Sequence, residues 1–346
     1  MRRRVSSQQV ADRAGVSRST VSMILNRSAG TFPAATRERV LAAAAALGYT
    51  PDSAARTLSR GSSDAIGLVI RNADLLETDG FVAPLLRGVG RIAHRHNHRV
   101  LVETVTGGRA DELGEPRTYA ELVDSRRVDG LIVLNPEQGD PELSALIDRG
   151  FPTVLLGSIG HRREVAVGIR AGEAVGALIG HLFRLGHRRI GHVTLSAPGP
   201  TATNTRLQAY RQALATLGLD REDALVACGD YSARSGFEAM GELLDRPRPP
   251  TAVFAANDTL ALGALSAATT RGLRVPDDVA VVGFDDLPFA AFLSPPLTTV
   301  RAPAVGEGEL AARHLFRILL GTEADAEIPL TLDTPLVVRA SCGGGA

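Results

Sequence analysis

From residue 65 onward, hydrophobic positions form short continuous runs, separated by longer stretches with helical spacing. Such runs, rich in β-branched residues, predict buried strands, and helices between them predict a parallel sheet covered on both faces. The expected strands are Ala65–Ile70, Arg99–Val105, Gly130–Leu134 and Thr153–Gly157, followed by Arg188–Leu195, Ala224–Ala227, Thr251–Ala256 and Val279–Phe284. Because the pattern stops after residue 157 and restarts near residue 175, we expect two doubly wound α/β lobes.

The segment Val5–Asn26 has helical spacing instead and predicts two short helices joined by a tight turn. Ser6 followed by Gln9 is the pattern of a capping box at the start of the first helix. Gly15 can take the positive φ of the turn, and Ser17 can cap the second helix. The inward stripe of that helix consists of Val21, Ile24 and Leu25.

The outward face of the second expected helix carries short polar donors. Its residues are Arg18, Ser19, Ser22, Met23 and Asn26. A helix pair of this size with such a face predicts a helix-turn-helix that enters the major groove of DNA. A generic helical hairpin is the alternative that the spacing leaves open. Met23 can touch a thymine methyl but makes no bidentate hydrogen bond, so Arg18, Ser19 and Thr20 are expected to discriminate bases.

Two further segments complete a specific pattern. TRERV at Thr36–Val40 opens a third helix that stops at Gly48, and GYTPDSAARTLSRG follows at Gly48–Gly61. Together with VADRAGVSRSTVSMILN at Val10–Asn26, these segments resemble the LacI/GalR family of transcriptional regulators, and the similarity continues to the end of the chain. The resemblance implies an all-α helix-turn-helix head and a periplasmic-binding-protein-like body of two parallel-sheet lobes.

The resemblance also implies a hinge at Pro51–Gly61. In the family this segment forms a helix in the minor groove, and a leucine, here Leu58, wedges between base pairs. A helix this short is marginal alone in water, so we expect it to form with a second subunit and DNA. The alternative is that Leu58 packs on the body. The expected DNA-binding residues are Ser6, Ser17, Arg18, Ser19, Thr20, Ser22, Met23, Asn26, Arg37, Ser53, Ala55 and Leu58.

Charge is distributed unevenly along the chain, although the formal net charge is +0. Residues 1–60 hold ten arginines and three carboxylates, a net charge of +7, so the remainder carries −7. A solvated surface is the usual interpretation of such arginines. Next to a helix-turn-helix pattern, a basic head on an acidic body favours binding to DNA phosphates.

These patterns divide the chain into domains. We expect a helix-turn-helix DNA-binding domain at 1–50, a hinge at 51–61 and an effector-binding and dimerisation domain at 62–346. Lobe 1 of that domain is expected at about 62–163 and 292–322, and lobe 2 at about 164–291 and 323–342. The helix Val305–Leu320 should return to lobe 1.

Polar residues follow several expected strands, where ligands of doubly wound sheets bind. The resemblance places the family's effector contacts at Arg206, Tyr231, Asn257 and Asp285. Tyr231 could instead be ordinary core, and Asp258 is expected to cap a helix rather than bind ligand.

Arg170 stands near a point where family members often carry an acidic residue. If Arg170 and Arg206 both face the cleft, the pocket is positive, and the effector carries a carboxylate or phosphate rather than being a neutral sugar. Arg170 is therefore a fifth expected effector contact.

The sequence thus predicts a cytoplasmic, nucleoid-associated transcriptional regulator, most often a repressor. It should bind a palindromic DNA operator as a homodimer and respond to a small-molecule effector, a sugar or related metabolite, in the interlobe cleft. We expect no cofactor, no metal and no membrane partner. The tail after residue 342 has no heptad extension, so nothing supports a tetramer-forming coil.

Two other classes fit less well. A secreted solute-binding protein would share the two-lobed body, but it needs a signal peptide and has no use for residues 1–60. An enzyme would need a nucleophile, a metal cluster or a phosphate loop, and we find no G-x-x-x-x-G-K-[ST], CxxC or G-x-S-x-G motif. His181, His187 and His192 have spacing unsuited to a metal site.

Overall fold

The computed structural model describes residues 5–25, 32–49, 62–71, 73, 75–105, 118–219, 225–322 and 330–344. The chain divides into two compact units, Met1–Asp64 and Ala65–Ala346, which we call the head and the body. Among the described residues, the helices lack the combination of length and apolar composition needed to cross a bilayer.

The head is a bundle of three helices that all contact one another. They are α1 (Ser7–Ala14), α2 (Arg18–Leu25) and α3 (Ala34–Leu47). The shared core is made of small and β-branched residues: Val10, Ala11, Ala14, Val21, Ile24, Val40, Ala43 and Ala44. Leu25, expected in the inward stripe, is partly buried against this core.

The first lobe of the body contains a parallel sheet of six strands in the order β11-β5-β4-β3-β1-β2. The strands are β1 (Ala65–Ile70), β2 (Arg99–Thr104), β3 (Gly130–Leu134), β4 (Thr153–Leu156), β5 (Ala166–Ile169) and β11 (Thr331–Leu332). The helices are α5 (Leu75–Thr78), α6 (Val82–Arg95), α7 (Tyr119–Asp124), α8 (Pro141–Asp148) and α13 (Ala304–Leu320).

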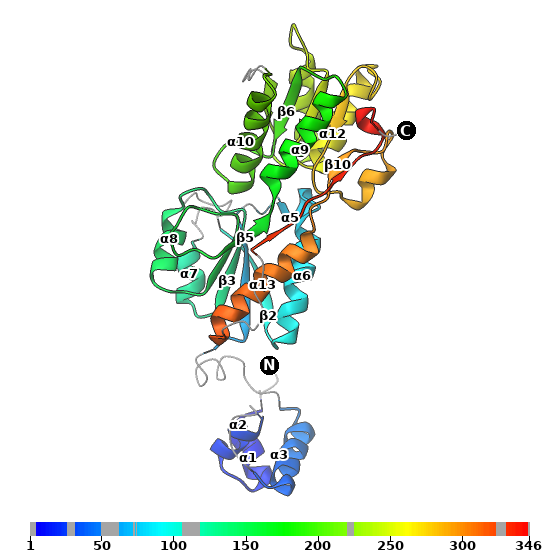
Figure 1. Cartoon of the computed structure of the whole chain (residues 1–346). Helices are drawn as coiled ribbons and strands as arrows, with labels where there is room; N and C mark the ends of the chain where they lie inside the picture. Colours follow the sequence, from blue (N-terminus) through cyan, green and yellow to red (C-terminus); the bar gives the residue numbers. More distant parts are fainter. Residues whose placement is uncertain are drawn as a thin grey trace. The chain divides into compact units, whose positions relative to one another are not determined.

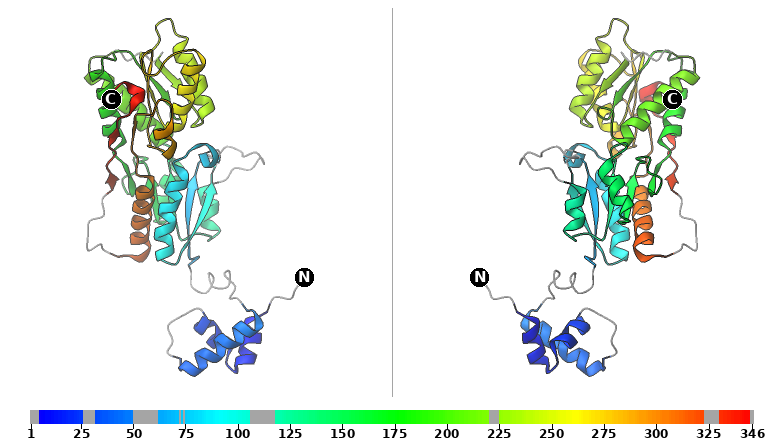
Figure 2. Two further views of the ribbon diagram at one scale, coloured as in Figure 1. Left: turned by 90° about the vertical axis from the view of Figure 1, so that its right-hand side faces the viewer. Right: turned by 90° about the vertical axis from the view of Figure 1, so that its left-hand side faces the viewer.

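Alternating side chains of the central strands fill a separate core on each face of this sheet. In β1, Leu68 joins the cluster that includes residues of α6 and α13, whereas Val69 joins the cluster under α7 and α8. Figures 1 and 2 show α6 and α13 side by side on one face, with α7 and α8 on the other. Because both faces are covered, the strands consist of continuous hydrophobic runs, as the sequence predicts.

The second lobe contains a parallel sheet in the order β7-β6-β8-β9. Its strands are β6 (Ile190–Thr194), β7 (Val226–Cys228), β8 (Ala252–Ala255) and β9 (Ala280–Val282). Helices α9 (Ala171–Arg184) and α10 (Thr201–Thr216) pack together, as do α11 (Ala233–Leu244) and α12 (Asp258–Thr270). The body therefore has the two parallel-sheet lobes expected from the sequence.

The chain passes between the lobes after β5, after β10 (Thr299–Val300) and after β11. β10 pairs antiparallel with β12 (Leu336–Val337), and two 3-10 turns, η2 (Pro288–Phe292) and η3 (Ala340–Cys342), flank this region. The first-lobe sheet thus extends past residue 163, the expected boundary, and includes β11, which the sequence assigns to the second lobe. Strands as short as β5 and β11 have too few residues to show a hydrophobic pattern in the sequence, so the sequence does not predict them.

Candidate functional site

Side-chain caps hold the helix-turn-helix of the head. Ser6 Oγ accepts a hydrogen bond from the backbone N–H of Gln9 at 3.4 Å, and Gln9 Oε1 accepts one from Ser6 N at 2.9 Å. Gly15 has a φ of 65°, and Ser17 Oγ accepts from Thr20 N at 3.1 Å. The expected capping box, left-handed turn and second cap are therefore confirmed.

The outward face of α2 keeps the expected residues accessible. Arg18, Ser19 and Ser22 are exposed, and Thr20 and Met23 are half-buried. Arg18 Nε donates to Ser7 Oγ at 3.1 Å, which fixes the guanidinium beside the start of α1. A short polar surface on a rigid helix is what reading a DNA groove requires.

The remaining expected DNA contacts divide into two groups. Arg37 is exposed on α3, whereas the hydroxyls of Ser6 and Ser17 are engaged in caps at the N-termini of α1 and α2. Four expected contacts lie outside the described residues: Asn26, Ser53, Ala55 and Leu58.

A cavity of about 330 Å³ lies between the two lobes of the body. It is lined by residues that follow strands of both sheets, the position where doubly wound folds bind ligands. Its main apolar residues are Leu75, Phe81, Leu134, Leu156, Val167, Ile169 and Leu195. Its polar residues are Asp79, Asn135, Ser158, Thr201, Thr205, Arg206, Tyr231, Asp285, Glu307 and Thr331. Largely apolar walls with a few fixed polar groups are typical of a small-molecule site.

Arg206, on α10, is fixed on several sides. Its Cζ lies 3.9 Å from the ring centroid of Phe284, and Nη1 donates to the carbonyl of Ala256 at 2.6 Å. Nη2 lies 3.5 Å from Oδ1 of Asp285. The Nε–H of Arg206 is buried and has no hydrogen-bond partner in the part of the chain that the structure describes. The guanidinium is thus held in place with one donor unused.

The cavity contains three carboxyl groups. Burial raises the pKa of Asp285 well above its ordinary value, although the charge of Arg206 opposes the shift. Burial also raises the pKa of Glu307 to about 7, against the same guanidinium. The pKa of Asp79 is raised by burial too, and a hydrogen bond from Phe81 N opposes that effect. Among the described lining residues, Arg206 is the one cationic side chain.

Asn135 joins the two lobes at the cavity wall. It follows β3 of the first lobe, and its Nδ2 donates to the hydroxyl of Tyr231 in the second lobe at 2.6 Å. Its Oδ1 accepts from Ala202 N at 2.8 Å and from Thr201 Oγ1 at 3.3 Å. Asn135, Tyr231 and Asp285 all have positive φ, of 49°, 73° and 116°. Strained backbone of this kind is common in ligand sites.

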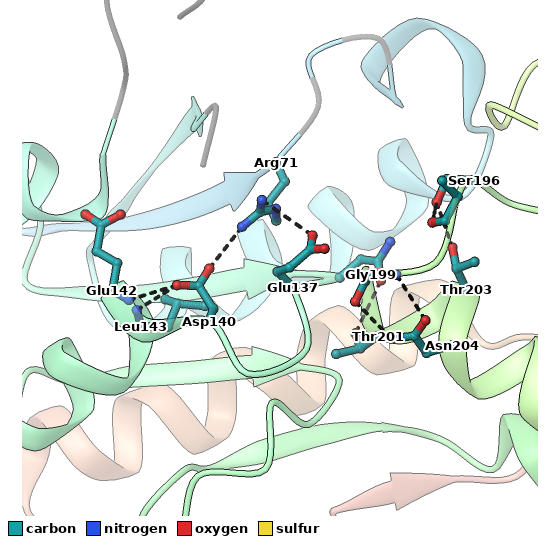
Figure 3. A network of polar contacts seen from close by, with 12 residues as sticks. Arg71, Glu137, Asp140, Glu142, Leu143, Ser196, Gly199, Thr201, Thr203 and Asn204 are labelled. Carbon is teal, nitrogen blue, oxygen red and sulfur yellow. Dashed lines mark hydrogen bonds and ion pairs between the residues drawn. The ribbon is translucent and has the colours of Figure 1, made fainter. Parts of the chain in front are cut away.

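A polar network continues this contact along the rim. Figure 3 shows Arg71 between Asp140 and Glu137, with Nη1 2.9 Å from Asp140 Oδ2 and Nη2 3.5 Å from Glu137 Oε2. Backbone hydrogen bonds of 2.9 Å join Gln138 N to the Gly199 carbonyl and Thr201 N to the Pro136 carbonyl. The loop after β3 is therefore tied to the start of α10 across the lobe junction.

Two expected assignments at the second lobe differ from the structure. Asn257, an expected effector contact, caps α12 by accepting from Leu260 N at 2.7 Å, and it does not line the cavity. Asp258, the expected cap, instead accepts from Leu287 N at 2.7 Å and Thr299 Oγ1 at 2.6 Å. An N-cap residue precedes the first helical residue, and the sequence alone did not separate these neighbours.

Arg170 lies outside the cavity lining. It precedes α9, its side chain is 48% exposed, and its Nε is 3.2 Å from Asp333 Oδ1. The premise of a positive pocket is therefore absent, since the one lining guanidinium faces three carboxyl groups. Of the five expected effector residues, the structure brings together Arg206, Tyr231 and Asp285.

Sequence reasoning missed Asp79, Asn135 and Glu307. Asn135 had a signal, because it directly follows the strand Gly130–Leu134 at the edge where ligands bind. Asp79 and Glu307 had none, since they reach the cavity from the loop before α6 and from the first turn of α13.

A helix-turn-helix head and a two-lobed body with an interlobe cavity define a class of DNA-binding transcriptional regulators. Residues 8–52 match the model for bacterial regulatory proteins of the lacI family, and residues 179–342 match a periplasmic binding protein-like domain. The HTH-type transcriptional regulator CelR of Thermobifida fusca is 37% identical over 98% of this chain and 99% of its own length.

Two solved structures are similar over the whole chain. A complex of the transcriptional regulator CelR with cellobiose has a TM-score of 0.71 at 35% identity, covering 98% of this chain and 100% of that one. The lac repressor dimer bound to operator and the anti-inducer ONPF has a TM-score of 0.83 at 27% identity, covering 98% and 99%. This chain belongs to the LacI family of transcriptional regulators.

Proposed function

We propose that this protein is a repressor that binds a palindromic operator as a homodimer, and that a saccharide in the interlobe cavity changes its affinity for DNA. It acts on the chromosome, and therefore in the cytoplasm. The observation that carries the proposal is the fixed Arg206, whose Nε–H has no partner among the described residues and whose guanidinium lies beside the carboxyl group of Asp285 in a largely apolar cavity.

A saccharide fits the chemistry of this cavity. Hydroxyl groups both donate and accept, so they can satisfy the carboxylate and the guanidinium donor together. The cavity volume lies near the lower end of the range of small-molecule sites, about 300 Å³, which suits a mono- or disaccharide. The similarity to a regulator that was solved with cellobiose supports the same class of effector.

Coupling to DNA follows from the contacts between the lobes. Asn135 and the rim network join the lobes beside the cavity, so a ligand that favours one interlobe angle also favours one arrangement of the segment leading to the head. Such coupling is limited to the difference in ligand affinity between the two arrangements. The hinge at 51–61, with Leu58 as a minor-groove wedge, is the expected link.

The test begins with selection of bound duplexes from the source genome by the purified full chain, in parallel with Leu58→Ala. We expect enrichment of a palindrome with a flexible central step, and loss of that enrichment in the variant. Retention of the selected duplex is then titrated with a panel of mono- and disaccharides. A palindrome whose binding no saccharide changes would contradict the effector half of the proposal.

A further inference from the structure

Glu307 is a buried carboxyl group that the fold itself does not satisfy. It is 6% exposed, and its Oε2 has no hydrogen-bond partner in the part of the chain that the structure describes. The residue lies in the first turn of α13 and lines the interlobe cavity. An ideal Cβ on Gly168 of β5 would lie 3.6 Å from Glu307 Oε1, which places the carboxyl against that strand.

A buried carboxyl oxygen without a donor is costly, so its presence needs a reason. Glu309, two residues further along α13, shows the ordinary solution: its carboxylate lies 2.9 Å from Arg91 and 2.7 Å from Arg313. Arg206, the one cation among the described lining residues, is already engaged with Ala256 and Asp285. None of the described lining residues donates to Oε2 of Glu307, so a donor on the occupant of the cavity would complete it.

We infer that the effector carries a cationic amino group that binds the carboxylate of Glu307, so that the ligand is an amino sugar rather than a neutral one. This inference rests on the proposed saccharide effector. Three carboxyl groups face one guanidinium in this cavity, and an ammonium group reduces that imbalance while donating to Oε2. A hydroxyl group donates a hydrogen bond but leaves the charge of Glu307 uncompensated. Apolar walls strengthen the attraction, because they lower the local dielectric constant.

Ligands that differ at one substituent test this inference. Isothermal titration calorimetry of the full chain uses three sets of sugars. The first set is glucosamine, N-acetylglucosamine and glucose, and the second is galactosamine, N-acetylgalactosamine and galactose. The third is the disaccharide of glucosamine, its diacetyl form and cellobiose. Within the set that binds, we expect the amine to bind at least about tenfold more tightly than its neutral counterparts. Glu307→Gln should abolish that preference, whereas Glu309→Gln should preserve it.

The outcomes separate this inference from the function on which it rests. A neutral sugar that binds as tightly as its amine, with Glu307→Gln unchanged, overturns the amino-sugar assignment and leaves a saccharide effector standing. Failure of every saccharide to bind overturns both.

The stability of the ligand-free protein gives a second readout. If Glu307 serves the ligand, Glu307→Gln should raise the unfolding temperature by about 2–4 °C, more at pH 8 than at pH 5. The reason is that the Glu307 carboxyl, which shares the cavity with Arg206, Asp79 and Asp285, ionises between pH 5 and pH 8. The buried charge then destabilises the folded protein. Glu309→Gln loses two ion pairs and should not raise it. A lower unfolding temperature for Glu307→Gln would show that the N-terminus of α13 stabilises the carboxylate, and would overturn the inference.

Discussion

The head and the interlobe cavity satisfy their polar groups in opposite ways. In the head, the side chains that cap the first two helices find partners within three residues, as Ser6 does with Gln9 and Ser17 with Thr20. In the cavity, Arg206 and Glu307 each keep a buried polar atom that has no partner among the described residues. The head thus satisfies its capping groups internally, whereas the cavity leaves polar atoms that a ligand would satisfy.

The largest expected effect comes from the core of the head. Val21 is fully buried between the three helices, so Val21→Asp places an unpaired charge there and costs about 4 kcal/mol or more. We expect operator binding to be lost while saccharide binding by the body remains. Filter binding and calorimetry on the same sample measure both. Retained operator binding would mean that the head does not depend on this core.

The next effect concerns the cavity. Arg206→Ala removes a charged donor and leaves Asp285 without its counter-charge, so saccharide affinity should fall roughly a hundredfold. Operator binding without ligand should remain. Arg206→Lys is the matched control, because it keeps the charge but loses the planar fork. If Arg206→Ala binds saccharide like the unmodified protein, the cavity is not the effector site.

Acid should distinguish the two units. His192 of β6 is fully buried, its Nδ1 lies 2.9 Å from the carbonyl of Phe254, and burial lowers its pKa to about 4. An unfolded histidine binds its proton near pH 6.5, so the stability that neutral His192 contributes is lost as pH falls from about 6.5 to 4. The loss approaches roughly 3 kcal/mol.

Thermal unfolding of the body at pH 7 and pH 4 measures this effect. His192→Gln should remove roughly 3 kcal/mol of acid destabilisation from this difference, to which Asp285 and Glu307 contribute in the opposite direction because burial raises their pKa values. The half-exposed His187 provides the control as His187→Gln. The head, which has no histidine in residues 1–60, lacks this source of acid sensitivity. An unchanged pH dependence in His192→Gln would contradict the assignment.

The smallest effect is a single cap. Ser17→Ala removes the acceptor for Thr20 N and should destabilise the head by about 1 kcal/mol, with a modest loss of operator affinity. Unfolding of the head, followed by circular dichroism, measures it. The comparison is Ser19→Ala on the exposed face, which removes only the contact of the Ser19 hydroxyl with Ser17 Oγ and leaves the acceptor for Thr20 N in place. Equal losses of unfolding free energy in the two variants would show that the Ser17 cap does not stabilise the head.

The same contrast explains what the sequence could predict. The head follows from local signals, since each cap and the turn at Gly15 involve neighbours in sequence. The long strands follow from hydrophobic runs such as Ala65–Ile70. Residues of the cavity come from segments far apart in sequence. The family resemblance places Arg206, Tyr231 and Asp285 in advance, whereas Asp79, Asn135 and Glu307 are not placed.

The remaining differences have the same cause. The expectation for Arg170 rests on its place near a point where family members often carry an acidic residue. Its neighbours Ile169 and Ala171 line the cavity, but the Arg170 side chain lies outside the lining and pairs with Asp333. Glu307 lies on a helix that returns from the second lobe, and it lines the cavity together with Arg206, about a hundred residues away in the sequence. Long-range packing of this kind leaves no periodic signal in the chain.

The measurement that tests the central claim most directly is the dissociation constant of the selected operator with and without a bound saccharide, in the full chain and in Arg206→Ala. Coupling between the cavity and the head predicts at least about a fivefold change for the unmodified protein and none for the variant at the same ligand concentration. The same change in both proteins, or none in either, would contradict control of DNA binding through this cavity.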